Sequence, residues 1–155
     1  MYAGERFNSI THLVGAALTL VGVSVMVTLA AVEGGALRIL TLTVYGIALF
    51  LLYLFSTLYL SLRGRAKRFF RVLDHQTIYL LIAGTHTPFT RLTLDGATGW
   101  WLFGAVGTLA LVGMTLDAIP RKGPRIPPLV IYLGMGWLVL FALEPLIATL
   151  PSAGF

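Results

Sequence analysis

Five polar side chains lie close to the ends of apolar stretches and carry the groups most able to do chemistry: Glu5, Asn8, His12, Asp74 and His75. The first three are separated by three and four residues, so in a helix they share one face. Asp74 and His75 are adjacent, and a helix turns their side chains about 100° apart. Carboxylates and imidazoles transfer protons and bind metal ions. Together the two groups predict a polar cluster near one end of the molecule.

Two interpretations of this polar cluster stay open. In the first, each side chain reaches the lipid headgroups from a helix end, and Asp74 stabilises a helix start through the helix dipole. In the second, the side chains form one buried polar site between helices. Ser56, Tyr59 and Asp117 are expected near the same end of the molecule.

The residues alone do not favour a metal site. Zinc requires three or four ligands about 2 Å from the ion. His75 and His86 share a helix face, but their spacing in sequence separates them by roughly 16 Å. His12 with Asp74 or His75 provides two strong ligands, and Glu5 is a doubtful third. The chain has no cysteine, which excludes thiolate ligands and a thiol nucleophile.

The elements that position these groups are strongly apolar. The chain has 155 residues, of which 57% are hydrophobic and 11% charged, and its mean hydropathy is +0.89. A soluble domain is about 45–50% apolar and about 25% charged, so this composition excludes a water-soluble enzyme. It also excludes a disordered tail. We expect an all-α membrane protein whose net charge of +5 resides in its loops and does not indicate nucleic-acid binding.

Five apolar stretches are long enough to cross about 30 Å of hydrocarbon as helices. They are expected at about 10–32, 39–62, 73–91, 98–118 and 129–150, within a single transmembrane domain of residues 1–155. The first stretch is too long for the apolar core of a signal peptide and is interpreted as a retained span. In the third, Pro88 predicts a kink at which a neighbouring Thr hydroxyl satisfies the carbonyl of Gly84. His86, beside it, is interpreted as a structural residue.

Basic residues predict the orientation of these spans. Only Arg38 and Arg91 fall on one side of the membrane. The other side carries nine of the eleven Lys and Arg residues: Arg6, Arg63, Arg65, Lys67, Arg68, Arg71, Arg121, Lys122 and Arg125. Because basic loops stay in the cytoplasm, the amino terminus is predicted to be cytoplasmic and Phe155 to lie outside.

Several motifs resemble the bacterial hemolysin III family of the progestin and adipoQ receptor superfamily. The segment ERFNSITHLVG, which starts at Glu5, is similar to the first-helix motif of that family. The resemblance continues in FSTLY from Phe55, in LDHQTIYLLIAGTHTPF from Leu73, in Gly136-Trp137-Leu and at Pro145-Leu. It therefore covers all five predicted spans.

The resemblance implies a seven-helix bundle with a zinc ion near the cytoplasmic face. In the family, one zinc ligand is a His four residues after the second-helix Ser, and two come from an H-x-x-x-H in the seventh helix. An Asp at the start of the third helix orders the zinc-bound water. Ser56 and Asp74 match the family's Ser and Asp, and are the catalytic candidates by resemblance. Superfamily members include receptors with lipid amide hydrolase character, and bacterial members are described as cytolytic or channel-like.

The chain departs from this pattern at two places. Leu60 occupies the position of the second-helix ligand, and the chain ends at Phe155, after the fifth span. We therefore expect a form truncated after the fifth helix that has no zinc, although intact family members hold it. The prediction is a non-catalytic, multi-pass protein of the bacterial inner membrane. Its partners are the lipid bilayer and, as an open question, further copies of itself. The alternative is a relative of zinc-dependent lipid amide hydrolases with an incomplete or variant site.

Overall fold

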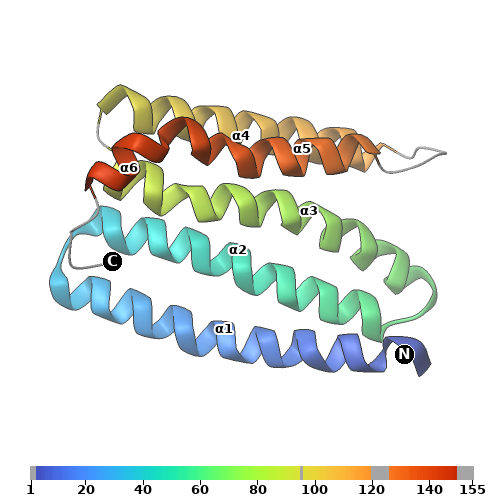
Figure 1. The fold of residues 1–155 in the computed structure, drawn as a ribbon. Helices are drawn as coiled ribbons and strands as arrows, with labels where there is room; N and C mark the ends of the chain where they lie inside the picture. The colour runs from blue at the N-terminus through green and yellow to red at the C-terminus, as the bar shows by residue number, and fades with distance from the viewer. Residues whose placement is uncertain (1–2, 95, 120–125, 150–155) are drawn as a thin grey trace.

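Every secondary-structure element that the structure describes is helical (Figure 1). The structure is a computed structural model that describes residues 3–94, 96–119 and 126–149. Its elements are the 3-10 turn η1 (Ala3–Glu5), α1 (Arg6–Glu33), α2 (Ala36–Ser61), α3 (Gly64–Pro88), the π-helical turn η2 (Phe89–Thr93), α4 (Gly96–Ala118), α5 (Ile126–Trp137), the 3-10 segment η3 (Leu138–Ala142) and α6 (Leu143–Thr149). Helices α1 to α4 pack in chain order, each antiparallel to the one before it, and α5 packs against both α3 and α4.

Three of the described helices are long and apolar enough to cross a membrane: α1, α2 and α4. A shorter apolar helix covers Ile126–Ala142. Helix α3 is less apolar because its first ten residues, 64–73, carry four Lys and Arg side chains. The all-helical class predicted from the sequence is confirmed, whereas the count of five spans and the cytoplasmic amino terminus stay predictions.

Helices α1 and α2 approach closely because small residues line their contact. The buried side chains of α1 are Ser9, Ala16, Thr19 and Ala30. The large aliphatic side chains of α1 are instead exposed, including Leu18 at 66% and Val21 at 65%. Such a pattern is the reverse of a soluble amphipathic helix, and it is typical of a helix that packs through small residues in lipid.

The second half of the molecule has a core of large side chains. Tyr79 of α3 and Met135 of α5 are fully buried, and Leu102 and Val106 of α4 are 1% exposed. These side chains form one cluster between α3, α4 and α5. Gly113 allows this packing, because a Cβ there would overlap the ring of Tyr79.

Helix α3 ends at Pro88, and the chain continues as the wider turn η2. The π-helical pattern is closed by the amide of Leu94, which donates to the carbonyl of Phe89 at 3.0 Å. The Thr hydroxyls of this region bond other carbonyls than the one predicted. Thr87 donates to Ala83 at 2.9 Å and Thr90 to His86 at 2.9 Å, not to Gly84.

Candidate functional site

The amino-terminal end of the bundle is held together by an ion pair between Glu5 and Lys67. The ammonium of Lys67 donates to both carboxylate oxygens of Glu5, at 2.8 and 2.7 Å. It also donates to the carbonyl of Tyr59 at 3.3 Å and lies 4.7 Å from the centre of the Tyr59 ring. Lys67 comes from the first turn of α3, so this pair connects η1 to the α2–α3 corner. Glu5 is therefore engaged in a structural contact.

His12 lies between α1 and α2, about two turns further into the bundle than Glu5. Its ring meets Tyr53 edge-on at 5.7 Å. One turn before it, the hydroxyls of Ser9 and Ser61 share a hydrogen bond of 2.6 Å. The Nδ1 atom of His12 is buried and has no hydrogen-bond partner in the described part of the chain. His12 thus offers a nitrogen lone pair or N–H group inside the helix pair.

Asn8 does not join this contact. Its side chain is exposed, although it belongs to the same motif as Glu5 and His12. The backbone carbonyl of Asn8 accepts a hydrogen bond from the hydroxyl of Thr11 at 2.9 Å. Asn8 is exposed because the contact between α1 and α2 is narrow. The helix face that Glu5, Asn8 and His12 share is wider than this contact, so Asn8 falls outside it.

Ser56 and Asp74 lie at the same level of the antiparallel α2–α3 pair. On one side of them, Gly84 approaches Tyr45 and Ala48. Ser56 and Asp74 are each about ten residues, or about 15 Å along a helix, from that contact. Beside them, Phe55, the residue before Ser56, meets Phe70, one turn before Asp74, with ring centres 6.0 Å apart. Ser56 is buried and Asp74 half-buried.

The residues after Asp74 bind the second half of the molecule. The carbonyl of His75 accepts a hydrogen bond from the Tyr132 hydroxyl at 3.3 Å, and Gln76 donates to the carbonyl of Met114 at 3.2 Å. The fold therefore brings His12, Ser56 and Asp74 to one level across α1, α2 and α3, while it turns the backbone of His75 toward α5. Asp117, on α4, is half-buried.

The residues at this level do not fit a zinc ion. No three His, Cys, Asp or Glu side chains come close enough to hold a metal within the ranges that the structure describes. Leu60 is half-buried on α2, one turn beyond Ser56, and its aliphatic side chain has no donor atom. What remains is a hydroxyl, a carboxylate and an imidazole without a third metal ligand.

His86 lies apart from this level, in the second half of α3. It is 8% exposed, and its Nδ1 atom lies 2.8 Å from the carbonyl of Ile82. This bond is consistent with the structural role expected for His86. Its Nε2 atom is buried and without a hydrogen-bond partner in the described ranges.

Sequence reasoning missed Lys67 and Ser61, the two partners that hold the first helix. Lys67 stands among four arginines, and nothing in its local sequence distinguishes it from them. Ser61 is one of several hydroxyl residues in α2. Only the helical phase of α2 and α3 separates these side chains from their neighbours.

The apolar helices and the small-residue contacts between them define this chain as an all-helical membrane protein. The model of the haemolysin-III related family matches residues 2–155, so the chain belongs to that family. It is 40% identical over 152 residues to Hemolysin-3 of Bacillus cereus, covering 97% of this chain and 69% of that protein. It is 39% identical over 152 residues to the Hemolysin-3 homolog of Bacillus subtilis (strain 168), with 97% and 71% covered. No solved structure matches the chain significantly.

Proposed function

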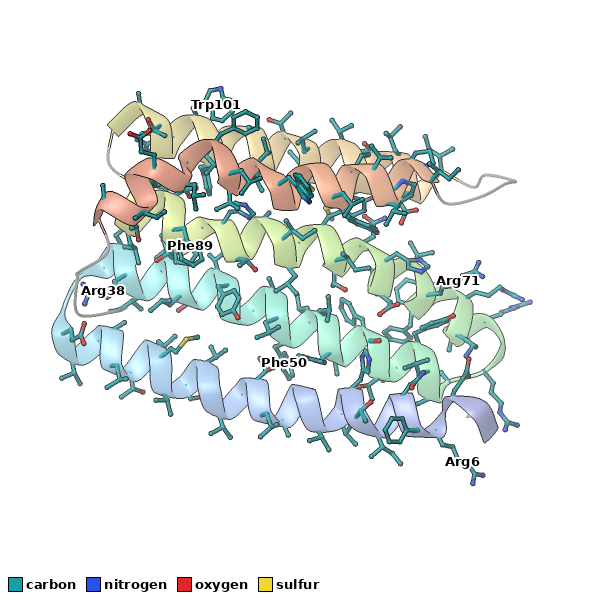
Figure 2. All side chains as sticks on the ribbon, in the orientation of Figure 1. Arg6, Arg38, Phe50, Arg71, Phe89 and Trp101 are labelled. Atoms are coloured by element: carbon teal, nitrogen blue, oxygen red, sulfur yellow. The ribbon has the colours of Figure 1, made fainter. Side chains whose placement is uncertain are left out.

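We propose that this family member crosses the bacterial inner membrane five times with its amino terminus in the cytoplasm. The distribution of charge supports the proposal. Arg6 and Arg71 lie at one end of the helices, and Arg38 lies at the opposite end (Figure 2). The end with Arg6 and Arg71 also has Arg63, Arg65, Lys67 and Arg68, as the positive-inside rule requires of a cytoplasmic face.

The absence of cysteine makes this orientation directly measurable. Ala36→Cys and Ala66→Cys form a matched pair, because both alanines are exposed and lie at opposite ends of the helices. A membrane-impermeant maleimide should label Ala36→Cys in intact cells and Ala66→Cys only after permeabilisation. The reverse labelling would contradict the proposed orientation.

We further propose that the chain acts as a non-catalytic membrane protein of the channel or cytolysin type. The observation that carries the non-catalytic role is Leu60, which places a hydrocarbon side chain where the family motif places a zinc ligand. Without a metal to polarise water, Ser56 and Asp74 have no activated nucleophile to direct. The channel or cytolysin type rests on the two Bacillus relatives, which are named Hemolysin-3 and Hemolysin-3 homolog.

Metal analysis of the detergent-purified protein tests the non-catalytic role. Wild type is expected to hold far less than one equivalent of zinc, and Leu60→His is expected to bind zinc only weakly, because it adds a single ligand. One tightly held equivalent in wild type would overturn the proposal. Leakage of dye from liposomes tests the channel or cytolysin type. Wild-type protein should increase the leakage, and the increase should grow with the density of protein in the membrane.

A second candidate function is a lipid amide hydrolase with a variant zinc site. Two observations favour it: the Nδ1 atom of His12, which has no hydrogen-bond partner among the residues that the structure describes, and the common level of Ser56 and Asp74. Under this alternative, wild type would bind one equivalent of zinc, and His12→Gln would lose it. The same metal analysis therefore distinguishes the two functions.

A further inference from the structure

The first turns of α3 carry a cationic patch that the site described above does not use. The patch consists of Arg65, Arg68 and Arg71, all of which are exposed. Their spacing of three residues places them on neighbouring turns of the helix. Lys67 lies in the same turns, but it is half-buried and bound to Glu5. The cationic patch thus faces outward, whereas its neighbour faces the bundle.

The cationic patch has no counter-ion within the described part of the chain. None of its arginines forms an ion pair there, not even with Asp74 on the same helix, and the carboxylate of Glu5 is bound to Lys67. The position is also unfavourable for positive charge, because a helix amino terminus already carries about half a positive elementary charge. Arg63, the N-cap of α3, provides no side-chain cap. An external anion would relieve both sources of repulsion.

Apolar side chains share the exposed side of these turns. Phe69 is 60% exposed and Val72 is 45% exposed. Phe69 also contacts Phe70 edge-on, with ring centres 5.3 Å apart. A soluble anion would leave Phe69 and Val72 in water, whereas an anion attached to a hydrocarbon tail would cover them. The combination indicates an amphiphilic ligand with a negative head.

The dimensions agree with the headgroup layer of a bilayer. Arg65 and Arg71 are separated by about 9 Å along the helix axis. One headgroup layer is roughly 5–8 Å thick, from the difference between the full bilayer and its hydrocarbon core. Arg71 lies just before the expected start of the third span at residue 73, so the patch extends outward from the hydrocarbon boundary.

We propose that the cationic patch is a binding site for an anionic phospholipid. The guanidinium groups of Arg65, Arg68 and Arg71 bind its phosphate oxygens, and Phe69 and Val72 lie against its acyl chains. Guanidinium suits this role because its planar N–H groups match phosphate oxygens in pairs. A zwitterionic lipid binds less well, because its own ammonium group cancels the phosphate charge. The inference rests on the proposed membrane insertion of α3.

Native mass spectrometry of the detergent-purified protein tests this inference. Phosphatidylglycerol and phosphatidylcholine with identical acyl chains are titrated separately, and wild type should bind phosphatidylglycerol more tightly. Each arginine near an anionic surface contributes about 1 kcal/mol, or about fivefold in affinity. R68Q should therefore weaken phosphatidylglycerol binding about fivefold. The triple variant R65Q/R68Q/R71Q should bind both lipids equally.

The matched control removes charge at the other end of the bundle. R38Q/R91Q should keep the wild-type preference. Equal binding of the two lipids by wild type, or an unchanged preference in R68Q with native helicity, would overturn the proposal. Displacement of the lipid by soluble glycerol phosphate would also overturn it, because the site would then recognise phosphate alone. The measurement in detergent does not depend on orientation, so a reversed cysteine-labelling pattern would reject the proposed topology separately.

Discussion

The two halves of the bundle are held together by different kinds of contact. Helices α1 and α2 meet through small and hydroxyl side chains, such as Ser9, Ala16 and Thr19. Helices α3, α4 and α5 enclose a core of large side chains around Tyr79 and Met135. Lipid tails are as apolar as Leu, so burying a large aliphatic side chain gains little between membrane helices. The first half therefore depends on close backbone approach, and the second on the fit of a few large side chains.

The largest effect is expected in the second half, from Tyr79→Ala. Tyr79 is fully buried, contacts Tyr132 with ring centres 4.4 Å apart and fills the space above Gly113. Truncation should lower the free energy of unfolding by about 3 kcal/mol, as for other buried aromatic side chains. Reversible unfolding in mixed micelles measures it. Leu111→Ala, at a side chain that is 67% exposed, is the control and should change stability little. Equal losses in the two variants would show that the second half has no specific core.

An intermediate effect is expected in the first half, from Gly46→Leu. A Cβ at Gly46 would overlap Val23 of α1, whose branched side chain has little freedom to move. The substitution should separate α1 from α2 and cost about 2 kcal/mol, a typical value for overpacking. Gly104→Leu on α4 is the matched control, since no atom lies within 4 Å of its Cβ position. The comparison is made by thermal denaturation in detergent, and a stable Gly46→Leu protein would mean that close approach does not hold this half.

The smallest effect is expected from Ser9→Ala, which removes the 2.6 Å hydrogen bond to Ser61. Hydrogen bonds between membrane helices average about 0.6 kcal/mol, so the loss should be of that size. A double-mutant cycle with Ser61→Ala isolates the interaction, and the double variant should be no less stable than either single variant. A coupling above about 2 kcal/mol would show that polar contacts dominate the α1–α2 pair.

The candidate site shows how far helical spacing alone can lead. Spacing places Glu5, Asn8 and His12 on one face, yet only Glu5 and His12 are partly buried in the structure. A face shared by residues three and four apart is broad, and the contact with α2 is narrow. The partners of Glu5 and Ser9 could not be inferred either, because Lys67 and Ser61 are selected by the rotation of other helices.

The amino-acid sequence by itself determined the all-helical membrane class and the family. These properties are local or additive, because hydropathy sums along a segment and a motif is a run of neighbouring residues. Only the tertiary structure decided that Lys67 binds Glu5. It also decided that His12, Ser56 and Asp74 share one level of the bundle. The outward position of Arg65, Arg68 and Arg71 was likewise decided by the tertiary structure. Those outcomes depend on the register and rotation of the helices, which are set where side chains such as Val23 and Tyr79 meet glycines on the facing helices.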